Sequence, residues 1–129
     1  MIYTSFFENL DNILSMPNTN IVSIAGWSPE RFIRLTFDNP IKFFKYSKLA
    51  PEYMWWKEWH DKNLSNEWYI EKYKETVLSK LDRLEVYKEL THNGFKNAIL
   101  LCWEGRGEFC HRQIVGNWLS EKGIYVKEL

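Results

Sequence analysis

Several features that would assign a protein to a broad class are missing from this sequence. Its 129 residues include only two cysteines, which excludes the disulfide framework of small secreted domains. Seventeen basic residues balance seventeen acidic ones, so no net charge favours a nucleic-acid duplex or an anionic membrane, and any nucleic-acid contact would be local. No stretch approaches the roughly 20 apolar residues of a membrane span. Residues 1–8 lack the basic flank and apolar core of a signal peptide, so we expect a cytoplasmic protein with no membrane partner.

What remains is the composition of a globular domain. Hydrophobic residues make up 45% of the chain and aromatic residues 17%, which is enough to bury one sizeable core. The chain is too short to suggest two cores. We therefore expect a single domain spanning residues 1–129.

The hydrophobic pattern alternates between short apolar runs and segments with helical spacing. The expected strands are residues 1–5, 21–25, 98–103 and 124–126, and the expected helices are residues 6–14, 52–62, 67–81, 82–93 and 110–122. Ser28 and Pro29 are typical of a helix start, and Asp82 with Glu85 resembles a capping box. Residues 31–51 show a mixed pattern that predicts no element.

The run Ala98–Trp103 contains no polar alternation, which is typical of a strand covered on both faces in a parallel sheet. We expect it to be the central strand. The sequence thus predicts an α/β fold with a mainly parallel sheet of about four strands flanked by helices, a Rossmann-like arrangement.

The segment after this strand is the best candidate for a chemical site. Ligands of open α/β sheets bind beyond the carboxyl ends of the strands, near helix N-termini. Gly105 and Gly107 supply a loop that can approach a ligand closely. Arg106 and Arg112 suit an anion such as phosphate or carboxylate.

Both cysteines flank this loop. Cys110 precedes His111 and Arg112 at a helix N-terminus, a setting that lowers a thiol pKa and favours a nucleophile. Cys102 is a packed apolar residue in the simplest interpretation, and a resolving or second reactive thiol in the alternatives.

Glu104 leaves the same strand end and is a candidate general acid or base, or a group that orients Arg112. The structural alternative is a helix start in which Arg112 braces the loop and an ion pair fixes it.

Two familiar cysteine chemistries do not fit the spacing. A cysteine-dependent phosphatase needs an arginine six residues after its cysteine, and Glu108 occupies that position after Cys102. No CxxC pair exists, and a zinc site would have to combine Cys102, Cys110 and His111 with one more ligand across a single loop. We therefore expect neither a metal nor another cofactor.

Trp55, Trp56 and Trp59 crowd the helix expected at residues 52–62. Core packing is the simplest interpretation of such a cluster. A protein-binding surface and a stacking wall for a base or sugar are the alternatives.

Several blocks of the chain resemble the family known as domain of unknown function 488. They are Leu100–Glu104, Glu108–Arg112, Trp118–Leu119 and Val126–Glu128, with Tyr3–Phe7, Val22–Gly26, Pro29 and Leu49–Pro51 as the matching N-terminal blocks. The resemblance covers nearly the whole chain and implies a compact α/β domain, but no established reaction. It adds Tyr3, Ser5 and Ser23 as candidate substrate contacts.

The chain departs from this family at one place. Many relatives carry an arginine in an Asp-Val-Arg setting after the second strand, where this chain has Ser23–Gly26. The departure removes one anion contact.

The leading functional hypothesis is an enzyme that acts on a phosphate-bearing small molecule, a nucleotide or a nucleic-acid end, by hydrolysis or glycosidic-bond cleavage. Arg112 and Arg106 would bind the anion, Glu104 would act as acid or base, and either cysteine as thiol or pocket lining. The alternatives are a non-catalytic module that binds a nucleotide or a protein, and a redox switch. The switch requires the Cα atoms of Cys102 and Cys110 to lie within roughly 7 Å of each other.

Overall fold

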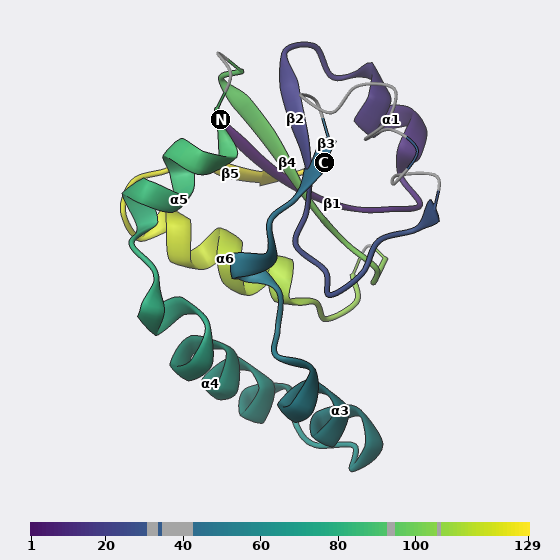
Figure 1. Ribbon diagram of the computed structural model, residues 1–129, viewed down its shortest axis with the longest axis vertical. Coiled ribbons are helices and arrows are strands. Elements are labelled where there is room, and N and C mark those ends of the chain that lie inside the picture. The colour runs from purple at the N-terminus through teal and green to yellow at the C-terminus, as the bar shows by residue number, and fades with distance from the viewer. Residues whose placement is uncertain (31–33, 35–42, 93–94, 106) are drawn as a thin grey trace.

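The computed structural model describes residues 1–30, 34, 43–92, 95–105 and 107–129 (Figure 1). Its strands are β1 (Ile2–Phe6), β2 (Thr19–Ser23), β3 (Phe43–Lys45), β4 (Asn97–Cys102) and β5 (Val126–Glu128). Its helices are α1 (Leu10–Ser15), α3 (Tyr53–Asp61), α4 (Asn66–Thr76), α5 (Arg83–Leu90) and α6 (His111–Ser120), with the short 3-10 helices η1 (Ser47–Leu49) and η2 (Leu78–Lys80).

The strands form one parallel sheet in the order β3-β2-β4-β1-β5. β4 is central, and Leu101 lies opposite Ser5 of β1 on one side and Ser23 of β2 on the other. This confirms the predicted α/β class and the predicted central strand. The strand count differs, because the short edge strand β3 lies in the stretch whose pattern predicted no element.

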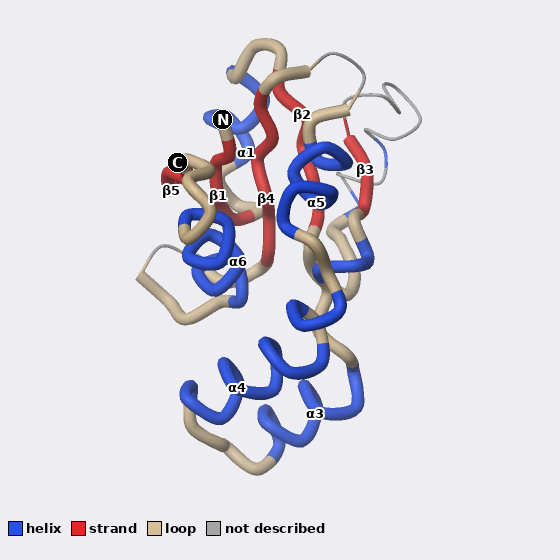
Figure 2. Tube along the Cα trace, turned by 90° about the vertical axis from the view of Figure 1, so that its left-hand side faces the viewer, coloured by secondary structure: helices blue, strands red, loops and turns tan. Residues whose placement is uncertain are grey.

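Helices cover both faces of the sheet (Figures 1 and 2). α1 packs on one face, where Ile13 joins a core cluster with Ile21 and Ile99. α5 and α6 pack on the other, where Leu90 and Val115 join the second cluster. Because both faces are buried, the central strand β4 carries a continuous apolar run instead of an alternating one.

α3 and α4 lie side by side beyond one end of the sheet (Figure 2). Trp55 and Tyr69 pack edge to face between them, with ring centroids 4.9 Å apart. Tyr69 also meets Phe109, in the loop after β4, with centroids 5.0 Å apart. The helix pair therefore borders the carboxyl end of the central strand.

The element boundaries differ from the predicted ones in explicable ways. Strand pairing continues past β1, because the Phe7 backbone N–H donates to the Cys102 carbonyl, so α1 starts at Leu10 and not at residue 6. The helix predicted over 67–81 ends at Thr76 and is followed by η2, and α5 begins where Asp82 accepts hydrogen bonds from two backbone N–H groups, as expected of a cap. Of the helix expected after Ser28, Glu30 is helical, and most of the rest lies outside the described residues.

Gly116 lets α6 approach the sheet closely. A Cβ built at this position would lie 3.3 Å from a methyl carbon of Val126 and 4.0 Å from one of Thr4. α6 carries His111 and Arg112 at its start, so this close contact sets the distance of both side chains from the sheet.

Gly116→Leu should lower the free energy of unfolding by about 1–3 kcal/mol, because the added atoms have no space between α6 and the sheet. Asn117→Leu, at an exposed position of the same helix, is the control and should change stability by less than about 0.5 kcal/mol. Urea denaturation of both variants measures the difference. Equal stabilities would show that α6 does not depend on close packing at Gly116.

Candidate functional site

The candidate site is the strand-loop-helix segment that joins β4 to α6. β4 ends at Cys102, and Cys110 occupies the N-cap position before α6. Gln113 ties the loop to the helix, because its side-chain oxygen accepts from the Cys110 N–H at 2.7 Å and its amide donates to the Glu108 carbonyl at 3.1 Å. The Gln113 side chain therefore holds the end of the loop that leads into α6.

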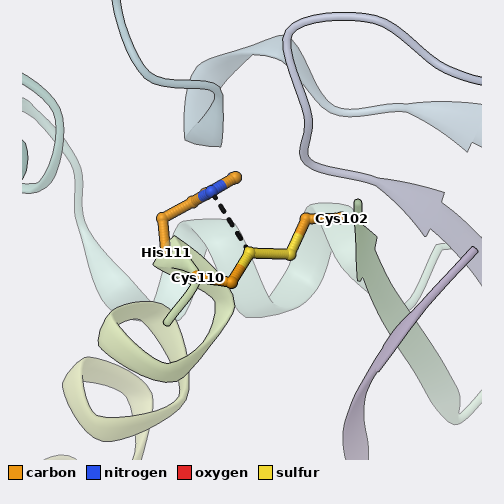
Figure 3. Close-up of side chains that lie close together, drawn as sticks. All are labelled: Cys102, Cys110 and His111. Atoms are coloured by element: carbon orange, nitrogen blue, oxygen red, sulfur yellow. Dashed lines mark hydrogen bonds between the residues drawn. A yellow bond between two sulfur atoms is a disulfide. The ribbon is translucent and has the colours of Figure 1, made fainter. Parts of the chain in front are cut away.

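Cys102 and Cys110 are buried and form a disulfide (Figure 3). Their Cα atoms are 7.2 Å apart, slightly beyond the roughly 7 Å that usually limits a disulfide. The sulfur pairing that a redox switch requires is therefore present.

His111 points toward the same sulfur atoms (Figure 3). Its Nε2 lies 2.7 Å from the Ile24 carbonyl oxygen, which can only accept, so Nε2 carries the proton of the neutral ring. Nδ1 then has a free lone pair and lies 3.7 Å from the Cys110 Sγ. Burial, together with the smaller effect of the Arg112 charge, lowers the pKa of His111 to about 4 although the hydrogen bond to Ile24 opposes the decrease, so the ring is neutral at pH 7.

Arg112 is fully buried, and all of its N–H groups are used within the protein. Nε and Nη2 donate to the Glu128 carboxylate at 3.0–3.3 Å. Nη1 donates to the Glu104 carbonyl at 2.6 Å and the Cys102 Sγ at 3.2 Å, and Nη2 donates to the Gly105 carbonyl at 3.1 Å.

These contacts match the bracing role weighed for Arg112 from the sequence and leave no N–H group for a substrate anion. The partner in the ion pair is Glu128 on β5, and Glu104 contributes its carbonyl oxygen. Glu128 stood out in the sequence only as part of a family block. Arg106 lies outside the described residues.

A cavity of about 150 Å³ opens at this end of the sheet. Its lining includes Cys102, Glu104, Cys110 and His111, so the structure brings the four predicted catalytic side chains together. Most of the remaining wall is aromatic, and consists of Trp27, Tyr53, Trp56, Trp59, Tyr69, Trp103 and Phe109.

Glu104 is the one carboxylate among the described residues that line the cavity. Burial raises its pKa, and the charge of Glu108 adds to the rise, whereas its backbone hydrogen bond and the Arg112 charge oppose it. The Glu104 charge in turn contributes to a raised pKa of Tyr69, after the larger effect of burial. Glu104 is thus a partly desolvated carboxyl group beside an aromatic wall.

The three tryptophans of α3 have different positions. Trp55 is buried in the core, as the packing interpretation expects, whereas Trp56 and Trp59 are partly buried and line the cavity. Trp27 and Trp103 stand across from α3 with ring centroids 4.6 Å apart, and the Trp103 indole N–H donates to the Trp27 carbonyl. Sequence reasoning missed these two and Tyr69 as wall residues, because only the fold brings their segments together.

Tyr3, Ser5 and Ser23 do not line the cavity in the described residues. Tyr3 packs against the α1-side core, and the Ser5 hydroxyl accepts from the Asn9 side chain at 3.1 Å. The Ser23 hydroxyl accepts from that of Ser28 at 2.8 Å.

A larger hollow of about 810 Å³ lies between α4, α5 and α6, but none of the predicted site residues lines it. Arg83 and Glu121 pair across it with a nitrogen to oxygen distance of 3.0 Å. The smaller cavity is the better candidate because the predicted catalytic residues line it.

Glu128→Gln should lower the free energy of unfolding by about 1–3 kcal/mol, because the buried Arg112 charge loses its counter-charge. The expected loss is not larger because the Glu128 side chain is partly exposed to water in the wild type. Lys127→Gln, on the same strand at an exposed position, is the matched control and should leave stability nearly unchanged. Chemical denaturation of both variants at pH 7 provides the comparison. A variant as stable as the control would contradict the central role of this ion pair.

Glu104 should make stability depend on pH. Its pKa in the folded state lies above the ordinary value of 4.5, so the folded chain binds more protons than the unfolded chain between these two pKa values. The wild type should therefore lose stability as the pH rises through this window. Glu104→Gln should remove this loss and become the more stable protein at neutral pH, as measured by denaturation from pH 4 to pH 8. An identical pH dependence in both proteins would contradict a desolvated Glu104.

A family model with the description "Active DUF488-N3 subclade" matches residues 34–123. No curated protein and no solved structure matches the chain. No helix in the described part of the chain is long and apolar enough to cross a bilayer. The matched segment is more than half of the chain and contains both cysteines, Glu104, His111 and Arg112. The chain therefore belongs to the DUF488 family, within the subclade DUF488-N3a.

Proposed function

We propose that this protein is an enzyme that cleaves the bond between base and sugar in a nucleoside, a nucleotide or a nucleic-acid end. The observation that carries the proposal is the cavity that a partly desolvated Glu104 lines together with a largely aromatic wall and with Cys102, Cys110 and His111.

The cavity favours a flat group of small size. A volume of about 150 Å³ is below the roughly 300–1,000 Å³ of pockets that enclose a drug-sized ligand. It has room for one ring system, with the rest of the substrate outside. Trp27 and Tyr53 have relative exposures of 69% and 66% and line the same cavity, so their rings offer exposed surface on which a base can stack.

Glu104 has the properties of a general acid for the leaving base. Its raised pKa keeps the carboxyl group protonated to higher pH than an exposed glutamate. Proton transfer from Glu104 to a ring nitrogen neutralises the departing base, and water adds to the sugar carbon that the base leaves. The products are the free base and the sugar, and the proton released by the water restores Glu104.

We assign no residue of the protein to bind the phosphate group of a nucleotide substrate. No Lys or Arg is among the described residues that line the cavity, and Arg112 is fully engaged by Glu128 and the loop carbonyls. The aromatic wall, and not a cation, is therefore the proposed recognition element.

Wild-type protein incubated with nucleosides, nucleotides and short single-stranded oligonucleotides should release free base, detected by liquid chromatography. Glu104→Gln should lower the rate at least about 100-fold, since it removes the proton donor. Glu108→Gln, in the same loop and outside the cavity lining, keeps an oxygen that can accept from Gly105 N–H and should retain the rate. No base release from any of these substrates by the wild type would contradict the proposal.

A second candidate function is a non-catalytic binding module. Met54 and Tyr53 on α3 have relative exposures of 81% and 66%, which places apolar surface beside the cavity mouth. Thermal shift separates the two functions: a module should be stabilised by its ligand equally in wild type and Glu104→Gln, with no base released by either protein.

A further inference from the structure

We propose that the chain, with its cysteines reduced, binds a zinc ion through the Sγ atoms of Cys102 and Cys110 and the Nδ1 of His111. The cysteine spacing gave no reason to expect a metal, because it lacks a CxxC pair. In the folded chain the loop turns back, so that the two cysteines lie beside His111 although their spacing in the sequence is unusual for a metal site. Zinc binding by these three residues does not depend on the proposed reaction.

The distances fit a metal site. The three ligand atoms lie within 4.8 Å of one another, and all three residues are buried. Zinc bonds of about 2.0–2.3 Å place tetrahedral ligand atoms roughly 3.3–3.8 Å apart. The 3.7 Å between His111 Nδ1 and Cys110 Sγ already has this value. The Cα atoms of the cysteines are 7.2 Å apart, so reduced side chains have room to separate around an ion.

His111 is oriented as a ligand. Its Nε2–H donates to the Ile24 carbonyl, which fixes the ring and directs the Nδ1 lone pair toward the sulfurs. Metal-binding histidines usually donate their other ring N–H to a backbone carbonyl or a carboxylate in this manner. The Ile24 contact therefore holds the ring in the orientation that a metal ligand needs.

The surrounding charges balance with zinc present. Each thiol releases a proton when it binds, so two thiolates neutralise the dication. Arg112 Nη1–H donates to the Cys102 Sγ at 3.2 Å, and the Arg112 charge is itself balanced by Glu128. A buried site with no net charge avoids the desolvation cost of an unpaired ion.

Three protein ligands leave one position of a tetrahedral zinc ion free. All three residues line the cavity, from which water or a substrate atom can reach an ion that they hold. Three protein ligands with an open fourth position are typical of catalytic zinc sites, whereas structural sites are closed by four. A cysteine pair with one histidine selects zinc over the hard ions calcium and magnesium, which prefer oxygen ligands.

The test is metal binding by the whole chain, reduced under anaerobic conditions and dialysed against zinc. Elemental analysis should find one zinc per chain, and cobalt in its place should give the absorption bands of tetrahedral thiolate coordination. Cys110→Ser and His111→Gln should each weaken zinc binding at least about 100-fold in competition with a chelator. His60→Gln, at an exposed position, is the control and should bind as the wild type does.

The wild type in its disulfide form serves as a second control that needs no substitution. It should bind no zinc, because both sulfurs are used in the bond. A reduced wild type without stoichiometric zinc would overturn the proposal and leave the cysteines as a redox pair. Equal affinity in His111→Gln, or zinc retained by the disulfide form, would overturn it as well. Since no readout involves a substrate, the outcome is independent of the proposed reaction.

Discussion

The buried guanidinium of Arg112 is the interaction on which the candidate site depends. A charge removed from water is tolerated only when a counter-charge and hydrogen-bond acceptors surround it. Arg112 meets this requirement with the Glu128 carboxylate, the carbonyls of Glu104 and Gly105, and the Cys102 sulfur. The acceptors come from β4, the loop and β5, so one side chain fixes their relative positions. The conformation of the loop follows from satisfying Arg112.

The cavity is a consequence of this arrangement. Because the Glu104 carbonyl faces Arg112, its side chain is left at the cavity wall. The start of α6 places His111 between the sulfurs and the Ile24 carbonyl. α3 and α4 then cover the carboxyl end of the sheet with aromatic rings. A carboxyl group, two sulfurs and an imidazole are thereby collected in an environment with little water, where their chemistry is most strongly altered.

The sequence predicted where the candidate segment lies in the fold, between β4 and α6, but not its internal contacts. The unbroken apolar run of β4 and the helical spacing of α6 are local patterns, and they placed the site at the carboxyl end of the central strand. Arg112 was assigned to an anion in the leading hypothesis because a sequence does not reveal that Glu128, 16 residues away on β5, is its partner. Trp27 and Tyr69 were missed for the same reason, since their segments reach the cavity only through the topology of the sheet. The short strand β3 left no pattern long enough to predict.

The central claim is that this cavity binds the flat ring of a nucleoside. The seven tryptophans provide an internal comparison, because Trp27, Trp56, Trp59 and Trp103 line the cavity whereas Trp55, Trp68 and Trp118 do not. The most direct measurement is an NMR titration of the indole N–H signals with purine and pyrimidine nucleosides. Our account predicts saturable shifts that are largest in the first group and small in the second. Signals that do not move with any nucleoside, or that move only in the second group, would contradict it.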